Sequence, residues 1–397
     1  MSYYVYQGSK KSRNNRGRQA AAPKKRGPKK DYIHPSKFVQ AAKPVTVEKY
    51  EPTHKFTDFA LEPFFHANIA KMGLTDPTPI QDKAIPAGLD GRDIVGIANT
   101  GTGKTAAFVI PVLQKLEIDQ KAQAIILAPT RELAQQIEQQ CFAIGNQMEL
   151  DHALLIGGVA MGPQLRQLRF NPRLIIGTPG RIKDHLERGT LKLDRCNIVV
   201  LDEVDRMLDM GFVHDITQIL SAAQKERQSF YFSATMDARV SGIINTFSHD
   251  PLLISVKAGQ TSANVEQDVV RYRHIDQKID LLHDTLITDP AMKAVIFDDT
   301  HRGVEKLTKE LVARGFPADS LHGGKTQGQR ARVLQKFKDN QVKLLVATDV
   351  AARGLDIADI THVINYSLPQ TYDDYVHRIG RTGRADRVGM ALTFIEA

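Results

Sequence analysis

A glycine-rich turn near residue 100 carries the clearest chemical signal in the chain. The apolar run 94–97 ends at this turn, and a helix-forming run begins shortly after it. Glycines let the backbone wrap closely around an anion, and the first turn of a new helix offers unpaired N–H groups. A lysine then supplies a positive charge, and a threonine hydroxyl can bind Mg²⁺. The turn therefore predicts a nucleotide-binding phosphate loop, made by Thr100, Gly101, Thr102, Gly103, Lys104 and Thr105.

Two adjacent carboxylates follow a second apolar run. Asp202 and Glu203 come directly after residues 198–201, and Asp205 lies two positions further on. An acidic cluster after a strand is often only a solvated loop or a helix cap. Since a phosphate loop lies roughly 100 residues upstream, this cluster instead suggests a metal ligand and a general base for nucleotide hydrolysis.

A cluster of arginines lies near the end of the chain. Residues 377–384 read HRIGRTGR, in which glycines separate three arginines. One of these arginines could reach the γ-phosphate as an arginine finger supplied within the same chain. The alternative from the octet alone is an exposed basic helix end.

The pattern of strands and helices indicates how these groups are positioned. From Phe56 onward, apolar strand runs alternate with helical runs, which predicts parallel sheets with helices on both faces. Polar motifs follow the carboxyl ends of the strands, where open α/β sheets bind ligands. Strands are expected at 94–97, 124–127, 174–176, 198–201 and 230–232, and, after a break near 257–264, at 269–272, 294–297, 344–347, 363–365 and 391–394. We therefore expect two α/β domains, at 51–255 and 256–397, after a disordered basic tail at 1–50.

Charge is unevenly distributed along the 397 residues. Residues 1–50 hold 13 Lys and Arg against 2 Asp and Glu, a net charge of +11, whereas the remainder has a net charge of −3. Such a tail lacks apolar periodicity and suits loose binding to a polyanion such as RNA. A nuclear import signal at the Lys24 cluster and a merely solubilising role remain alternatives.

Composition excludes several other classes of protein. No apolar run approaches the roughly 20 residues of a membrane helix, and no signal peptide is evident at the N-terminus. Cys141 and Cys196 lack metal-ligand spacing, so buried free thiols are expected in place of disulfides. We therefore expect a soluble, cytoplasmic protein, and nuclear import through the tail stays open.

Taken in order, the motifs resemble those of the DEAD-box RNA helicases, with two RecA-like domains covering about 56–397. The matching segments are Phe56 with 73–81, 98–105, 129–134, 157–158, 178–181, 202–205, 233–235, 348–356 and 377–384. Each segment is weakly specific by itself, but their shared order and spacing make the resemblance specific.

The resemblance implies a role for each matching residue. Gln81 would read adenine while Phe56 stacks on it; Thr105 and Asp202 would hold Mg²⁺, and Glu203 would activate water. Asp205 would bond to Ser233 and Thr235, with His377 also coupling the motifs. Asp356 would contact the ribose, and Arg381 and Arg384 would meet the γ-phosphate. RNA phosphates and sugars would be contacted by Arg131, Gly158, Thr178, Arg181, Thr300, Arg330 and Thr348.

The sequence departs from the family pattern at several positions. Val204 replaces alanine, and local repacking is expected to accommodate it. Asp298 and Asp299 precede Thr300 and weaken the expected RNA contact there. Residues 322–326 resemble a second phosphate loop, but Asp319 stands where its first glycine belongs. Relatives usually continue into a helix after the last strand, so we expect the second domain to be partly uncovered.

The sequence thus predicts a monomeric, RNA-dependent ATPase that uses ATP and Mg²⁺ to separate short RNA duplexes. The alternative is a nucleotide-switched RNA clamp in which unwinding is incidental. Both functions use the same residues, so the sequence does not distinguish them. No protein partner is predicted.

Overall fold

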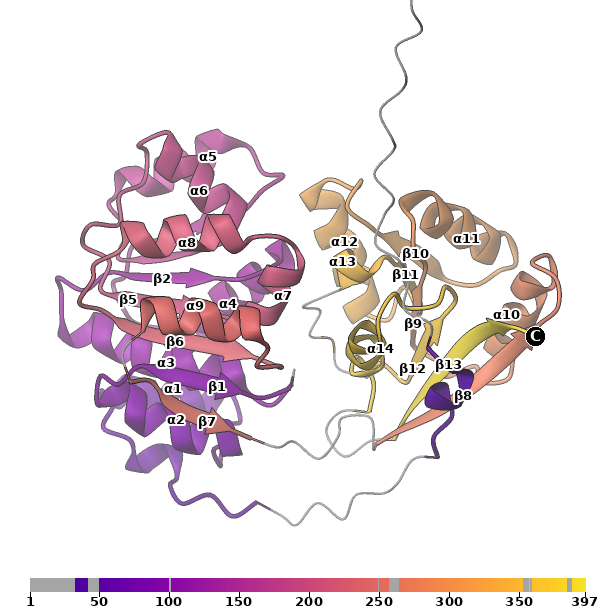
Figure 1. The fold of residues 1–397 in the computed structure, drawn as a ribbon, viewed down its shortest axis with the longest axis horizontal. Coiled ribbons are helices and arrows are strands. Elements are labelled where there is room, and N and C mark those ends of the chain that lie inside the picture. Colours follow the sequence, from indigo (N-terminus) through magenta and orange to yellow (C-terminus); the bar gives the residue numbers. More distant parts are fainter. Residues whose placement is uncertain are drawn as a thin grey trace, which may run out of the picture. The chain divides into compact units, whose positions relative to one another are not determined.

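Two parallel β-sheets, each with helices on both faces, form the fold (Figure 1). The computed structural model describes residues 33–41, 50–99, 101–248, 250–256, 264–352, 357, 359–383 and 388–397. We call residues 50–256 the first lobe and residues 264–397 the second lobe. The predicted pair of α/β domains is confirmed. Residues 1–32, which hold most of the predicted basic tail, lie outside the described ranges.

The first lobe contains a seven-stranded sheet in the order β3-β4-β2-β5-β6-β1-β7, with parallel pairing throughout. Its strands are β1 (Ile94–Ile97), β2 (Ala124–Leu127), β3 (His152–Leu155), β4 (Leu174–Gly177), β5 (Ile198–Leu201), β6 (Gln228–Ser233) and β7 (Leu252–Ser255). Its helices are η2 (Phe56–Asp58), α1 (Pro63–Lys71), α2 (Pro79–Leu89), α3 (Lys104–Ile118), α4 (Arg131–Ile144), α5 (Met161–Arg169), α6 (Pro179–Glu187), α7 (Val204–Asp209), α8 (Val213–Ala222) and α9 (Ala238–Phe247).

The second lobe contains a six-stranded parallel sheet in the order β10-β11-β9-β12-β13-β8. Its strands are β8 (Val265–Tyr272), β9 (Ala294–Phe297), β10 (Ala318–Leu321), β11 (Leu344–Ala347), β12 (His362–Asn365) and β13 (Gly389–Glu396). Its helices are α10 (Gln277–Ile287), α11 (His301–Ala313), α12 (Gln327–Lys338), α13 (Asp349–Ala352) and α14 (Tyr372–Ile379). No helix in the described part of the chain is long and apolar enough to cross a membrane.

Central strands are apolar throughout because both of their faces are buried. In β5, Ile198 and Val200 join the core under α1–α4, whereas Val199 and Leu201 join the core under α6–α9. Successive side chains of a strand point to opposite faces, so a strand covered on both sides needs an unbroken apolar run. The polar groups at the strand ends are therefore held on a rigid, well-packed sheet.

Three strands are missing from the sequence prediction, and all three lie at sheet edges. β3 and β7 end the first sheet, and β10 ends the second. Each is incompletely buried, and the sequence of β10, Ala-Asp-Ser-Leu, is half polar. An edge strand packs against a neighbour on only one side, so its sequence carries a weaker apolar signal.

Part of the predicted tail is folded onto the second lobe. Residues 33–41 contain the helix η1 (Pro35–Phe38), and Gln40 forms an antiparallel bridge with Gln267 of β8. Phe38 is 1% exposed and belongs to the core of the second lobe. The prediction that a disordered tail extends to residue 50 is therefore wrong for residues 33–41. These residues also cover part of the lobe that was predicted to be open.

Candidate nucleotide and nucleic-acid site

The phosphate loop lies between β1 and α3. Gly103 has φ +88°, and a Cβ atom there would lie 2.5 Å from the Gln81 side-chain nitrogen, so the position requires glycine. Lys104 begins α3, is 6% exposed, and donates from Nζ to the Ala98 carbonyl at 2.8 Å. Its ammonium group therefore lies over the loop. Thr100 lies outside the described residues.

Gln81 contacts the phosphate loop directly, which the sequence interpretation missed. Its Oε1 accepts from the Thr78 backbone N–H at 2.9 Å, and its Nε2 donates to the Gly103 carbonyl at 3.0 Å. Thr78 Oγ1 donates to the Thr102 carbonyl at 2.8 Å. The start of α2 is thus bonded to the loop on both sides. An amide has two donor hydrogens and two acceptor lone pairs, so this geometry leaves capacity for a base edge.

Phe56, the residue expected to stack on adenine, lies in η2 on the same lobe. Its ring is 4% exposed and packs edge-on against Phe59, with 5.9 Å between the ring centroids. The ring therefore contributes to the apolar core here, and adenine stacking on Phe56 stays a prediction.

Asp82, next to Gln81, is the centre of a polar cluster that the sequence interpretation did not identify. Its carboxylate accepts from Tyr50 Oη at 2.5 Å, from the backbone N–H groups of Thr53 and His54 at 2.8 and 3.1 Å, and lies 2.7 Å from His54 Nδ1. Burial opposes ionisation, but the hydrogen bonds outweigh it and lower the pKa of Asp82. Burial also raises the pKa of Tyr50 to about 12. Residues 50–54 are thereby fixed to the helix that carries Gln81.

Asp202 and Glu203 are buried together at the carboxyl end of β5. They are 3% and 5% exposed, and the Glu203 backbone has φ +53°, a left-handed conformation that is unusual for a non-glycine residue. Burial raises the pKa of Asp202 to about 7, reinforced by the charges of Glu203 and Asp205 and opposed by Lys104. Glu203 Oε2 is buried without a hydrogen-bond partner, and Arg206 Nε lies 4.0 Å from it as an ion pair. A buried carboxylate oxygen of this kind is suited to accept from a water or to face a cation.

Asp205 connects this acid pair to the end of β6. Its Oδ2 accepts from the backbone N–H groups of Ala234 and Thr235, both at 3.1 Å, and from Thr235 Oγ1 at 3.2 Å. The expected bond to Ser233 is not formed, because the Ala234 amide occupies that place and Ser233 Oγ is buried without a partner. Val204 is fully buried in the core between these carboxylates, so the substitution in the motif is accommodated by packing.

In the second lobe, His377 lies in α14 and Arg381 in the turn that follows the helix, but Arg378 makes the strongest contacts. Arg378 is 2% exposed, and its Nε and Nη2 donate to the two oxygens of Asp349, each at 2.6 Å. Its Nη1 donates to the Ser367 carbonyl at 2.6 Å. Arg381 is buried, and its Nε donates to the His377 carbonyl at 3.3 Å. Arg384 and Asp356 lie outside the described residues.

A groove brings together several residues predicted to bind RNA. It has a volume of about 400 Å³, and its lining includes Arg131, Thr178, Arg181 and Arg330. Burial and the charges of Arg330 and Arg181 lower the pKa of Arg131, opposed by the charge of Glu132, and all three arginines line the same groove. Converging guanidinium groups suit a phosphate backbone.

The neighbours of these arginines explain two further sequence features. A Cβ atom at Gly158, where φ is +73°, would lie 2.1 Å from Arg131 Nη1, so the glycine makes room for this guanidinium. Arg330 Nε donates to Glu132 at 2.6 Å, and both side chains are buried. Glu132 was not predicted as a site residue, and no local pattern marks a pairing between residues so far apart in sequence.

Two further predicted RNA contacts, Thr300 and Thr348, are not among the residues that line this groove. Thr348 is 6% exposed, and Thr300 caps α11 by accepting from the Gly303 N–H at 3.0 Å. The two carboxylates before Thr300 have protein partners: Asp298 accepts from Ser367 Oγ at 3.0 Å, and Asp299 lies 3.8 Å from Arg378.

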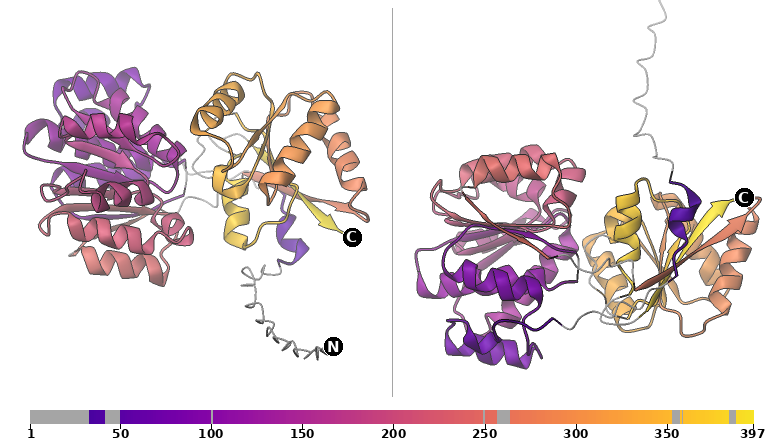
Figure 2. Two further views of the ribbon diagram at one scale, coloured as in Figure 1. Left: turned by 90° about the horizontal axis from the view of Figure 1, so that it is seen from above. Right: turned by 60° about the horizontal axis from the view of Figure 1, so that its bottom comes forward.

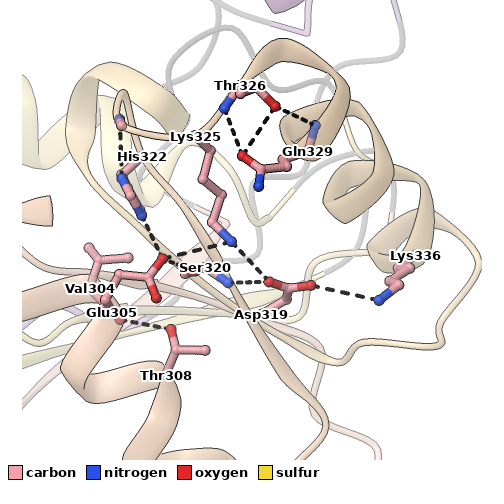
Figure 3. A network of polar contacts seen from close by, with 11 residues as sticks. Val304, Glu305, Thr308, Asp319, Ser320, His322, Lys325, Thr326, Gln329 and Lys336 are labelled. Atoms are coloured by element: carbon pink, nitrogen blue, oxygen red, sulfur yellow. Dashed lines mark hydrogen bonds and ion pairs between the residues drawn. The ribbon is translucent and has the colours of Figure 1, made fainter. Parts of the chain in front are cut away.

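Residues 322–326, which resemble a second phosphate loop, form an internal polar network instead (Figure 3). Lys325 Nζ lies 3.4 Å from Asp319 and 3.8 Å from Glu305, and His322 Nε2 lies 2.7 Å from Glu305. Thr326 caps α12 by accepting from the Gln329 N–H at 3.3 Å. A lysine paired with two carboxylates is poorly placed to bind phosphate.

Both cysteines are buried free thiols, as predicted, and burial raises the pKa of Cys196 to about 12. Among the described residues, no three His, Cys, Asp or Glu side chains form a metal-binding group.

Two parallel-sheet lobes, a phosphate loop and a buried acid pair define a RecA-like nucleotide-hydrolysing protein. The DEAD/DEAH box helicase family model matches residues 78–242, and the helicase conserved C-terminal domain model matches residues 277–386. The chain belongs to the DEAD-box family of ATP-dependent RNA helicases, and ATP is the substrate of this family.

Curated relatives and solved structures support the same assignment. The chain is 46% identical to the ATP-dependent RNA helicase CshA of Listeria monocytogenes over 86% of this chain and 66% of that protein. It is 45% identical to the DEAD-box ATP-dependent RNA helicase CshA of Bacillus subtilis over 86% and 70%. The chain thus spans about two thirds of the length of these relatives.

Two solved structures of proteins bound to RNA and a nucleotide analogue are similar to this chain. Dbp5 of S. cerevisiae bound to RNA and ADP BeF3 matches with a TM-score of 0.77 and 29% identity, covering 86% of this chain and 89% of that chain. Mss116p bound to ssRNA and AMP-PNP matches with a TM-score of 0.79 and 28% identity, covering 88% and 76%.

Proposed function

We propose that the chain is an RNA-stimulated ATPase that separates short RNA duplexes. The observation that carries this proposal is the burial of Asp202 and Glu203 together beside Lys104, with one Glu203 oxygen that accepts no hydrogen bond. A carboxylate in this position can accept the proton of a water that attacks the γ-phosphate.

The residues present fit a magnesium ion. Magnesium at nucleotide sites is commonly held by one or two carboxylates together with substrate phosphates, so a larger protein cluster is not needed. Asp202 and Thr105 would hold the ion, which would neutralise charge on the phosphates when bound. A nearby cation would also keep Asp202 ionised despite its burial. Lys104 would turn from the Ala98 carbonyl to the phosphates.

Discrimination for adenine would come from Gln81, whose amide can pair bidentately with the N6/N7 edge. Because Gln81 is bonded to Gly103, a base bound at Gln81 is coupled to the loop that holds the phosphates. Phe56 would stack on the base after a small rearrangement of η2.

RNA would bind through phosphates and sugars at the groove lined by Arg131, Thr178, Arg181 and Arg330. Such contacts do not read sequence, and the 2′-hydroxyl would distinguish RNA from DNA. RNA and ATP together would draw the lobes into a closed state in which Arg381 and Arg384 meet the γ-phosphate. A monomer would suffice, because both lobes belong to one chain.

The first experiment is an ATPase assay with and without single-stranded RNA, followed by release of a labelled strand from a short duplex. ATP hydrolysis that RNA stimulates, together with strand release, is the expected result. Hydrolysis that RNA does not alter would contradict the proposal. Prolonged retention of RNA after ATP addition, without strand release, would favour a nucleotide-switched clamp.

Arg384→Ala provides a second test. An arginine finger is typically worth ~10³-fold or more in rate, so RNA-stimulated hydrolysis should fall far more than ATP affinity does. Equal losses in rate and affinity would indicate a merely structural arginine.

A further inference from the structure

Residues 33–41 form a folded segment that comes before the first lobe in sequence yet packs in the second lobe. Figure 2 shows η1, in indigo, beside the yellow strand β13 in both views. Phe38 packs in one apolar core with Val265 of β8, Ala391 and Ile395 of β13, and Tyr375 and Ile379 of α14. We call residues 33–41 the docked segment.

Hydrogen bonds fix the docked segment to the outermost strand of the second sheet. The backbone of Gln40 exchanges two hydrogen bonds with that of Gln267 in β8, at 2.9 and 2.8 Å. β8 ends the sheet, so its outer edge would otherwise present unpaired backbone groups. The pairing therefore extends the sheet locally and sets the register of the segment.

The same segment contacts α14 through an aromatic cluster. The Phe38 ring meets the Tyr375 ring edge-on, with 4.8 Å between centroids, and Lys37 Nζ lies 5.1 Å from the centroid of the Tyr372 ring. The Tyr375 hydroxyl donates to Gln267 Oε1 at 2.8 Å. Gln40, Gln267, Tyr375 and Phe38 thus form one connected group. Both Phe38 and Tyr375 are fully buried, so neither can move without disturbing the other.

The docked segment covers one face of α14. Tyr372, Tyr375 and Ile379 are spaced three and four residues apart, which places them on the same face. His377 and Arg381 are likewise four apart, and Arg381 Nε donates to the His377 carbonyl. His377 lies within this eight-residue helix, and Arg381 is bonded to it from the following turn, so a tilt of the helix at Tyr375 would move both residues.

We propose that the docked segment is an integral part of the second lobe and that Phe38 is a positioning residue for α14 and for the turn after it, which carries Arg381 toward the nucleotide. The second half of this inference rests on the proposed ATPase function. The second lobe would then include residues that precede the first lobe in sequence. The first lobe begins at Tyr50, which is separated from the docked segment by eight residues in sequence and is bonded to Asp82.

The test uses Phe38→Ala in the full chain, with Val39→Ala as a matched control, because Val39 is 52% exposed. Removal of a fully buried aromatic ring should lower the amide hydrogen-exchange protection of α14 by about 100-fold. Protection in β5 of the first lobe should not change. Phe38→Leu, which keeps an apolar side chain in the site, should recover most of the protection.

Turnover then tests positioning separately from folding. Below the unfolding temperature, RNA-stimulated turnover per nucleotide-binding molecule should fall at least about tenfold in Phe38→Ala, because small displacements of catalytic groups are costly. ATP affinity in the absence of RNA should be unchanged, since Lys104 and Gln81 belong to the first lobe. Phe38→Leu should restore turnover in parallel with protection of α14.

Each result has one meaning. Unchanged protection of α14 in Phe38→Ala would overturn the docking of the segment. Reduced protection with normal turnover would overturn the positioning role. Absence of RNA-stimulated hydrolysis in the parent protein would refute the proposed function, and would leave the hydrogen-exchange result to decide the docking.

Discussion

The ion pair between Arg378 and Asp349 should contribute more to the second lobe than any other single polar contact in α14. Arg378 is 2% exposed and donates to both oxygens of Asp349, each at 2.6 Å, and to the Ser367 carbonyl at 2.6 Å. Its guanidinium also lies 5.0 Å from the centroid of the Phe297 ring. Truncation would leave the carboxylate with no bidentate partner.

Arg378→Ala should therefore destabilise the second lobe by about 3 kcal/mol, the lower end of the range for breaking a buried pair, because the Asp349 side chain is still 20% exposed. For a lobe of this size, such a loss lowers the melting temperature by roughly 10 °C. Arg378→Lys should recover little, since an ammonium cannot reproduce the planar fork.

A double-mutant cycle with Asp349→Ala measures the pair itself. We expect the double variant to be less destabilised than the sum of the single variants by about 2 kcal/mol, because the singles leave one charge unpaired. Unfolding should be monitored by hydrogen exchange in α14 and β9, because both elements belong to the second lobe and report on it alone. The coupling should depend little on added salt, since the pair is buried. A loss below about 1 kcal/mol for Arg378→Ala, or additive effects in the cycle, would refute this reasoning.

Four further predictions concern the first lobe and the tail. Lys104→Ala should abolish ATP binding, whereas Glu203→Gln should retain ATP and RNA but stop turnover; near-parent hydrolysis by Glu203→Gln would exclude it as the base. Gln81→Ala should remove discrimination between ATP and GTP in competition binding, and a parent protein that already uses both would contradict this role. Asp82→Asn should reduce the free energy of unfolding at neutral pH. Because the folded pKa of Asp82 is lowered, the difference in stability from the parent should shrink as the pH falls below about 4. A difference that does not change with pH would show that the Asp82 carboxylate does not stabilise the fold through its charge. Residues 1–32 hold ten Lys and Arg and one Asp. Their removal should flatten the slope of log RNA affinity against log salt concentration by up to about 7 and leave turnover at saturating RNA unchanged. Equal slopes for the full and shortened chains would show that the tail does not contact RNA.

The boundary of that truncation follows from the fold. The tail predicted from charge extends to residue 50, but Phe38 and Gln40 are part of the second lobe. Deleting them together with the basic residues would confuse loss of RNA contacts with loss of packing. The charge pattern could not show this, because the burial of Phe38 depends on strands that lie more than 200 residues further along the chain.

Central strands and loop motifs could be predicted from sequence because their signals are local. β5 reads as an unbroken apolar run, and the acid pair follows it directly. The contacts of Asp82, Arg378 and Glu132 could not be predicted, since each partner lies far away in sequence or is a backbone group. The predicted bond between Asp205 and Ser233 is not formed, and the Asp205 oxygen accepts from the backbone amide of Ala234 instead. A sequence motif does not show where backbone amides point.

The polar groups of the site fall into two kinds: those whose hydrogen bonds fix the loops in place, and those that still have an atom available for a ligand. Asp205 accepts four hydrogen bonds, and Arg378 donates to a carboxylate, a carbonyl and an amide oxygen. Groups so fully engaged have little capacity left for a ligand and serve to fix the loops that meet at the strand ends. Glu203 is different, because it lies at the same edge in a left-handed backbone conformation, and its buried Oε2 accepts no hydrogen bond and has only Arg206 Nε at 4.0 Å as an ionic neighbour. Under the proposed function, this oxygen would accept a hydrogen bond from the attacking water during turnover.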